Sequence, residues 1–434
     1  MRNKFVAALI VLAAVPAHAK IDVDTVRVAH GVRAWYSASP TVPVVDIEIS
    51  FEGAGYASDP AGKEGRAALA ASMLTEGAGS YDALAFQQAL EDGAIELSAS
   101  SSADRMTIHV RALREQAMYA GELLALALKE PRIAKEDLAR VKAQTTTMLA
   151  RFNESAGYRS GRLMAQHAFP NHPYANPPYG TADSIGNLSA DDLRGFLSTY
   201  ATRSNVKIAA AGDVDSGLLD DMLDPLLEAL GENESEPYIA PVRMQGAGEQ
   251  LRETMPVPQT VVQFAAPGIA RSDKRFYAAS ILNHALGGDG LIARLARGVR
   301  QDKGLVYSIG STLDIRRGAA LITGSFATRN ASAAEAIAAV KSVLSDMQQR
   351  GLTMQECEDA RTYVLGSQML RLDSSEDVAS TLLSMQIYGL GEDYLDKRED
   401  YINGVSCDDV NALARELLDP SRFLFATVGG TDAP

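Results

Sequence analysis

The chain repeats itself, and this internal repeat constrains its fold more than any single motif does. The alternating apolar stretch VPVVDIEISFEGAG begins at Val42, and a similar stretch, VPQTVVQFAAPGIA, begins at Val257. SNVKIAAAGDVD begins at Ser204, and SRFLFATVGGTD begins at Ser421. Two further pairs of segments have nearly the same spacing along the chain. They are TIHVRA with LITGSFA, and EDLARVKAQTTTML with QECEDARTYVLGSQML. Four matched pairs in one order indicate a duplicated domain.

Each half mixes strand and helix patterns without regular β-α-β alternation. Apolar alternation with a period of two predicts strands in the first half over 26–36, 43–52, 94–100, 105–112 and 205–211. Helical patterns follow Gly62, Tyr81, Arg114 and Lys135, and a capping signal at Ser189–Asp192 predicts one more helix. This order predicts an α+β fold in which each half is an antiparallel sheet packed with helices.

The repeat and the local composition together suggest the domain boundaries. We expect the two homologous domains to be residues 20–230 and 249–434. Residues 231–248 are polar and contain Gly and Pro, which is typical of a linker between domains.

The first 19 residues have the pattern of a secretory signal peptide. Arg2 and Lys4 precede an apolar run, and Ala17-His18-Ala19 matches a cleavage site. The run is too short to span a bilayer, so we expect an exported protein, cleaved after Ala19, with no membrane contact. Loss of the two cations would change the formal net charge from −14 to −16. This acidity argues against nucleic acid as a partner.

Cys357 and Cys407 are the only cysteines of the chain. Export would allow a disulfide between them. Cys357 also lies in a helical pattern, where a thiol can simply be packed, so the sequence leaves both states open.

The segment Leu286–Ser308, LGGDGLIARLARGVRQDKGLVYS, is the most specific motif. A Gly-rich turn, which lacks the lysine and spacing of a P-loop, leads through a helical stretch to Arg300 and then Tyr307. This segment resembles the C-terminal domain of the M16 metallopeptidases, the family of insulinase and mitochondrial processing peptidase. The first half follows the order of M16 domains at His172-Pro-Tyr174, Gly180-Thr181, Leu193, Phe196, Tyr200, Asn205 and Gly212-Asp213.

The resemblance covers essentially the whole mature chain and is greatest to the two-domain bacterial M16B branch. Because the chain also carries a signal-peptide pattern, we expect a periplasmic protein. Catalytic M16 domains carry His-x-x-Glu-His on a helix, where two imidazoles bind zinc and the glutamate takes a proton from the zinc-bound water. In the segment Gly62–Met73 the ligand positions are Ala68 and Ser72, and the base position is Ala71. Methyl groups neither bind zinc nor accept a proton.

The third zinc ligand of the family, a glutamate, would fall in the mid-140s. No acid occurs there between Asp137 and Glu154. The histidines offer no replacement: His30, His109 and His284 are isolated, and the spacing of His167 and His172 does not place them on one helix face. A G-x-S-x-G turn and a catalytic cysteine context are also absent. We therefore expect no cofactor in this chain.

In the M16 family, the Arg/Tyr pair, here Arg300 and Tyr307, reaches towards the zinc of a facing catalytic domain and binds the substrate backbone. The resemblance therefore implies the zinc-less subunit of a heterodimeric zinc endopeptidase. The partner would carry His-x-x-Glu-His and the zinc, and the two subunits would enclose an unfolded peptide. The alternative is a non-catalytic peptide-binding or structural assembly protein with an M16 fold, for which a substrate-binding pair has no evident use.

Overall fold

The computed structural model describes residues 21–232, 238–288, 292–367 and 372–430. The expected signal peptide, part of the expected linker (233–237) and part of the Gly-rich turn (289–291) lie outside the described residues.

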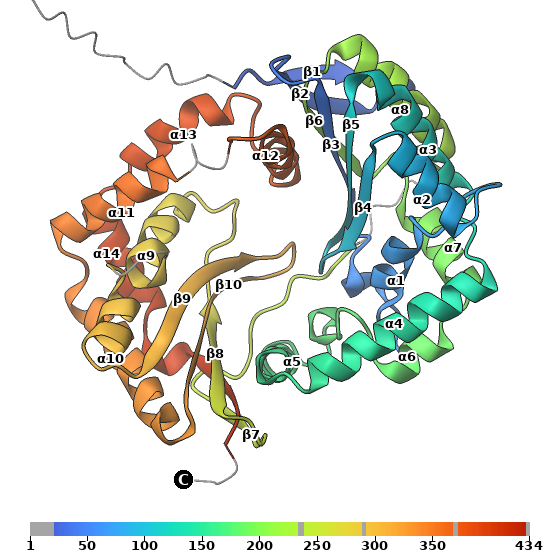
Figure 1. Cartoon of the computed structure of the whole chain (residues 1–434). Helices are drawn as coiled ribbons and strands as arrows, with labels where there is room; N and C mark the ends of the chain where they lie inside the picture. Colours follow the sequence, from blue (N-terminus) through green and yellow to red (C-terminus); the bar gives the residue numbers. More distant parts are fainter. Residues whose placement is uncertain (1–20, 233–237, 289–291, 368–371, 431–434) are drawn as a thin grey trace, which may run out of the picture.

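Two sheets of the same strand order form the centres of the two halves (Figure 1). Among the described residues, the order is β1-β2-β6-β3-β5-β4 in the first sheet and β7-β11-β8-β10-β9 in the second. Apart from β1, each strand of the first sheet has a counterpart at the same place in the second. The strands of the first sheet are β1 (Asp24–Arg27), β2 (Arg33–Ala38), β3 (Val44–Glu52), β4 (Glu96–Ser101), β5 (Arg105–Leu113) and β6 (Val206–Gly212). Those of the second are β7 (Gln250–Glu253), β8 (Gln259–Pro267), β9 (Val306–Ile315), β10 (Ala320–Arg329) and β11 (Leu424–Val428).

The expected α+β class with two homologous domains is confirmed. Each sheet is antiparallel except for one pair at the same place: β2 is parallel to β6, and β7 is parallel to β11. The expected strand over 26–36 is instead the antiparallel pair β1 and β2. The chain turns between them at Ala29–Gly31, where His30 adopts a left-handed backbone conformation with φ 57°.

Helices cover both sheets, as the alternation of strand and helix patterns predicts. Those of the first half are α1 (Arg66–Met73), α2 (Ala83–Asp92), α3 (Ala117–Lys129), α4 (Lys135–Asn153), α5 (Ala156–Ala168), α6 (Ala182–Asn187), α7 (Ala190–Tyr200) and α8 (Ser216–Ala229). Those of the second half are α9 (Phe276–Gly287), α10 (Ala333–Arg350), α11 (Met354–Gly366), α12 (Ser375–Ile387), α13 (Tyr394–Asn403) and α14 (Cys407–Leu417). Within the described ranges, none of these helices has the length and apolar content required to cross a bilayer.

The two halves exchange helices across the space between them. α5 follows α4 in the first half but packs on β8 and β11 of the second sheet. α12 follows α11 in the second half but packs on β2, β3 and β6 of the first sheet. Figure 1 shows both helices on the sides of the two sheets that face each other. Each sheet is therefore completed by a helix from the other half.

Strand β3 shows how the first sheet is buried on both faces. Ile47, Ile49 and Phe51 are fully buried in the apolar core of the first half. Asp46 and Glu48 alternate with them and are also buried, because α12 covers their face of the strand. Two carboxylates thus lie at the contact between the halves.

The described part of the expected linker is bound to both halves. The amide of Gln245 donates to the carbonyl of Ala168 in α5, and the amide of Val242 donates to the carbonyl of Gly318, each at 2.9 Å. Ile239 is buried in the cluster between the halves. The segment therefore adds to the contact between the halves.

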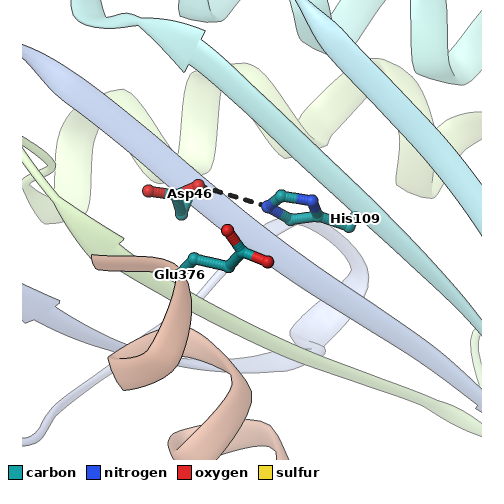
Figure 2. A group of neighbouring side chains, drawn as sticks. All are labelled: Asp46, His109 and Glu376. Atoms are coloured by element: carbon teal, nitrogen blue, oxygen red, sulfur yellow. Dashed lines mark hydrogen bonds and ion pairs between the residues drawn. The ribbon is translucent and has the colours of Figure 1, made fainter. Parts of the chain in front are cut away.

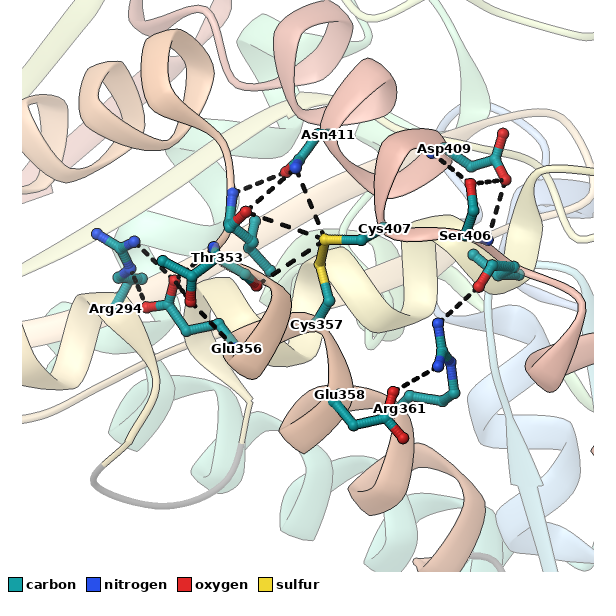
Figure 3. The surroundings of a disulfide bond; sticks show 12 residues. Arg294, Thr353, Glu356, Cys357, Glu358, Arg361, Ser406, Cys407, Asp409 and Asn411 are labelled. Atoms are coloured by element: carbon teal, nitrogen blue, oxygen red, sulfur yellow. Dashed lines mark hydrogen bonds and ion pairs between the residues drawn. A yellow bond between two sulfur atoms is a disulfide. The ribbon is translucent and has the colours of Figure 1, made fainter.

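Cys357 and Cys407 form a disulfide, which settles the alternative that the sequence leaves open (Figure 3). Cys357 lies in the first turns of α11, and Cys407 is the first residue of α14. Both residues are buried. The bond closes a loop with a sequence separation of 50 and fastens the two helices together within the second half.

Candidate functional site

Helix α1 holds the residues at the expected zinc positions. Ala71 is buried in the core of the first half. Ala68 and Ser72 lie one turn apart, as two ligands would, but the hydroxyl of Ser72 donates to the carbonyl of Ala68 at 3.0 Å. The helix therefore keeps the spacing of the motif and presents a methyl group and an internally bonded hydroxyl in place of two imidazoles.

Helix α4 contains the region of the expected third ligand. The side chains there include Thr145 and Thr147, whose hydroxyls donate to the carbonyls of Val141 and Ala143 at 2.9 Å. Both hydroxyls are thus bonded to carbonyls of their own helix. At the expected ligand positions, neither α1 nor α4 has a carboxylate or an imidazole that could bind a metal.

Arg300 and Tyr307 lie side by side in the structure. The guanidinium carbon of Arg300 is 5.3 Å from the centre of the Tyr307 ring. Arg300 lies in a π-helical turn, η5 (Ala296–Gln301), and such turns often occur at functional sites. Tyr307 lies near the start of the edge strand β9, and 83% of its surface is exposed. Guanidinium donors and a phenol hydroxyl are thus available on the surface.

The backbone between Arg300 and Tyr307 fixes their separation. The amide of Gly304, which has φ 62°, donates to the carbonyl of Arg300 at 3.0 Å. The amide of Leu305 donates to the carbonyl of Val299 at 3.1 Å, and the buried hydroxyl of Thr328 donates to the carbonyl of Leu305 at 2.6 Å. The pair therefore stands on a turn that is bonded to η5 and to β10.

Two of the histidines have structural roles. In His172, Nδ1 accepts from the amide of Tyr174 at 3.2 Å and Nε2 donates to the carbonyl of Ala240 at 3.0 Å. This residue therefore joins its loop to the expected linker. His284 is buried on α9, and its ring stacks on Tyr363 at 3.9 Å between ring centres.

The sequence does not predict the cluster formed by Asp46, His109 and Glu376 (Figure 2). These residues come from β3, β5 and α12, and their ligand-type atoms lie within 4.8 Å of one another. His109 Nε2 is 3.2 Å from Asp46 Oδ1, and Arg111 donates to the same oxygen at 3.3 Å. Because a guanidinium already occupies this position, the cluster is better suited to joining the halves than to holding a metal ion.

The ionisation of the cluster follows from burial and hydrogen bonding. Burial opposes the charge of Asp46, but hydrogen bonds from His109 and Ser375 outweigh it and lower its pKa. The hydrogen bond to Asp46 raises the pKa of His109. Burial raises the pKa of the neighbouring Glu48 to about 7. The contact between the halves therefore includes groups that titrate near neutral pH. In the sequence, only the two carboxylates in the apolar run VVDIEIS, Asp46 and Glu48, hint at this charged cluster.

Two family models match the chain. The peptidase M16 (insulinase) model matches residues 33–182, and the peptidase M16 inactive domain model matches residues 187–364. Among curated proteins, the chain is 27% identical over 399 residues to the non-peptidase homolog YmxG of Helicobacter pylori, covering 91% of this chain and 90% of that protein. It is 23% identical over 389 residues to the uncharacterized zinc protease YmxG of Bacillus subtilis, covering 89% and 94%.

Solved structures show the same fold. The peptidase M16 inactive domain from Pseudomonas fluorescens superposes with a TM-score of 0.89 at 24% identity, covering 95% of this chain and 99% of that one. A chain of complex III2 from Candida albicans superposes with a TM-score of 0.77 at 17% identity, covering 94% and 95%. The chain therefore belongs to the peptidase M16 family, and alanine and serine occupy its expected zinc positions.

Proposed function

We propose that this chain is the zinc-less subunit of a heterodimeric, exported zinc endopeptidase of the M16B branch. A partner subunit bearing His-x-x-Glu-His supplies the zinc and the base. This chain supplies Arg300, Tyr307 and half of the chamber that encloses an unfolded peptide. In this proposal, only the partner subunit binds zinc.

The juxtaposition of Arg300 and Tyr307 carries the proposal. A tyrosine with a purely structural role would bury its ring, whereas Tyr307 is 83% exposed and lies beside a guanidinium. At an exposed position this cation–π contact contributes only about 0.5–1 kcal/mol to stability. A ligand for the two polar groups explains the arrangement better than folding does.

The pair suits a peptide carbonyl that is under attack. The guanidinium has fixed donors and the phenol has one, and both can hydrogen-bond to an oxygen that gains negative charge in the transition state. Removing one such donor commonly lowers kcat by about 100- to 1000-fold. This role requires a nucleophile from another chain, since Ala68, Ala71 and Ser72 cannot activate water.

The disulfide supports the exported location. Disulfides form and persist in oxidising compartments such as the bacterial periplasm. Cys357 and Cys407 are joined here, and the chain begins with a signal-peptide pattern. Mass spectrometry of the protein recovered from the periplasm should find an N-terminus at Lys20 and no free thiol.

The test is co-expression of this chain with an M16 protein that carries His-x-x-Glu-His and is encoded nearby. We expect the pair to co-purify, to contain zinc and to cleave unfolded peptides. Arg300→Ala and Tyr307→Phe should each lower kcat of the pair by about 100-fold or more. Lys303→Ala is the matched control, because Lys303 is an exposed cation in the same turn.

Three outcomes would contradict the proposal. Zinc binding and peptidase activity of this chain alone would show that the active site is not on a partner. Full activity of the pair after both substitutions would remove the role of Arg300 and Tyr307. Recovery only as a self-dimer or in an unrelated assembly would favour the structural alternative.

A further inference from the structure

A cavity of about 930 Å³ lies in the second half and faces the exchanged helix α12. Its floor is the polar face of β8, β9 and β10, including Gln263, Thr323 and Ser325. Ser380 and Ser384 of α12 line the opposite side. Helices α9, α11 and α13 contribute the remaining walls. Its volume falls within the range of ligand-binding pockets, and its lining combines polar side chains with aromatic and aliphatic ones.

The charge of this cavity differs from that of the whole protein. The chain has a formal net charge of −14, yet among the described residues that line the cavity the charged side chains are Arg271, Arg398 and one acid, Asp377. Asp377 is exposed, and its carboxylate accepts from the Ser374 hydroxyl at the start of α12 at 2.6 Å. A surplus of positive charge therefore lines the cavity of an acidic protein.

Arg271 is held in place by aromatic side chains. Its guanidinium lies 4.2 Å from the ring centre of Phe276 and 5.4 Å from those of Tyr277 and Tyr394. It donates to the hydroxyl of Tyr394 at 3.0 Å. The rings fix the orientation of the guanidinium without neutralising its charge.

Arg398 lies one turn after Tyr394 on α13 and close to Arg271. It donates to the carbonyl of Val364 at 2.7 Å. Burial, and then the positive charge of Arg271, lower its pKa. Among the described residues, neither guanidinium has a carboxylate within ion-pair distance. Two neighbouring, partly buried cations without a counter-ion are unfavourable, because buried charges are normally paired. A bound anion would remove this cost.

We propose that Arg271 and Arg398 bind a carboxylate of a peptide held in this cavity, an inference that rests on the proposed peptide-binding function. Arginine forms directed hydrogen bonds with carboxylates. The hydroxyl and amide groups of the floor can bond to the peptide backbone next to that carboxylate. The carboxylate is either the C-terminus of the peptide or an acidic side chain. The site therefore selects peptides with a negative charge at the end that enters the second half.

The test measures binding to the full chain alone by calorimetry, using an acetylated, otherwise uncharged short peptide. The peptide is prepared with a free C-terminus, with a C-terminal amide, and with a C-terminal amide preceded by glutamate. We expect one or both of the acidic forms to bind, and the uncharged amide to bind about 10- to 100-fold more weakly. A free-carboxylate preference identifies the C-terminus, and a glutamate preference identifies a side chain. Binding should weaken as the NaCl concentration rises.

The variant Arg398→Gln should lose this preference, and Arg398→Lys should retain part of it. Arg415→Gln is the matched control, because it makes the same charge change at an exposed position. Circular dichroism melting verifies that each variant is folded.

Equal binding of all three peptides, binding of inorganic phosphate but of no peptide, or an unchanged preference in folded Arg398→Gln would overturn the proposal. These results concern the chain without a partner. They are therefore independent of the assays with Arg300 and Tyr307 that test the proposed function.

Discussion

The two exchanged helices occupy equivalent places in the two halves but make chemically different contacts. α5 meets the second sheet through apolar side chains, including Met164 and Ala168, and through an ion pair between Arg159 and Glu253 of β7. α12 combines an apolar contact with the charged cluster of Asp46, His109 and Glu376 at its N-terminal end. The duplicated fold thus keeps the geometry of the exchange while its chemistry differs. The α12 contact includes Glu48, whose pKa is raised to about 7 by burial, so a change of pH near neutrality perturbs this contact.

The largest effect is expected from a charge introduced under α5. Ala168 is fully buried among apolar side chains of both halves. Ala168→Asp would bury a carboxylate without a partner and should lower the free energy of unfolding by about 3–5 kcal/mol. Urea denaturation provides the measurement. Gln166→Asp, at an exposed position of the same helix, should change it by less than about 0.5 kcal/mol. Equal losses of stability in the two variants would show that water reaches the α5 contact.

A smaller effect is expected from Asp46→Asn under α12. The amide keeps the shape of Asp46 but loses the charge that faces His109 and Arg111. We expect a loss of about 2 kcal/mol, because Arg111 is partly exposed and can be solvated. Glu376→Gln is the control, since Glu376 is 3.9 Å from Arg111 and its side chain is 54% exposed. A larger effect at Glu376 would contradict the view that Asp46 is the centre of the cluster.

The pH dependence of stability should also originate at the α12 contact. The pKa of Glu48 is about 7 in the folded protein, against an ordinary value of 4.5. Between these values the folded state binds more protons than the unfolded state, so stability falls as pH rises. The raised pKa of His109 acts in the same direction. Its contribution to stability is full below the ordinary pKa of 6.5 and is lost as the pH rises through the pKa of the folded state.

Glu48→Gln tests this dependence. The substitution removes the cost of ionising Glu48 and should raise stability at about pH 8 by on the order of 2 kcal/mol relative to about pH 5. Urea denaturation at the two pH values gives the comparison. An unchanged pH profile would rule out Glu48 as its source.

The smallest effect is expected from the exposed ion pair between Arg33 of β2 and Glu392, which also joins the halves. The atoms are 2.6 Å apart, but the side chains are 57% and 42% exposed. Exposed pairs contribute about 0–1 kcal/mol. Arg33→Ala should therefore shift the melting temperature little, and that shift should shrink further in high salt. A loss of stability comparable to that of Asp46→Asn would contradict the view that the buried cluster stabilises the contact between the halves more than this exposed pair does.

The elements of each half could be predicted from the sequence, because their signals are local. The alternation in VVDIEIS gives β3, and the repeat gives its counterpart β8. The exchange of α5 and α12 could not be predicted, because periodicity indicates that a helix has a buried face but not which sheet buries it. The expected strand over 26–36 was wrong at His30, whose left-handed backbone conformation has no clear signature in the sequence.

The candidate sites differ in the same way. Arg300 and Tyr307 lie on one short segment, so a family pattern was sufficient to find them, and their role stays a prediction. Arg271 and Arg398 are far apart in the sequence, and the structure brings both to Tyr394. Asp46 and Glu376 meet only because α12 crosses to the other half. Residues brought together by tertiary structure alone leave no pattern of spacing.

The helix exchange has a consequence for how the chain can be divided. Its connectivity is that of a helix-swapped dimer whose two copies have been fused into one polypeptide. A fragment that ended at residue 230 would expose the face of its sheet around Trp35 and Ala209, which α12 covers in the whole chain. The complementary fragment would lack α5. The two pieces, if co-expressed as separate polypeptides, should therefore reassemble by fragment complementation, whereas either one by itself should aggregate.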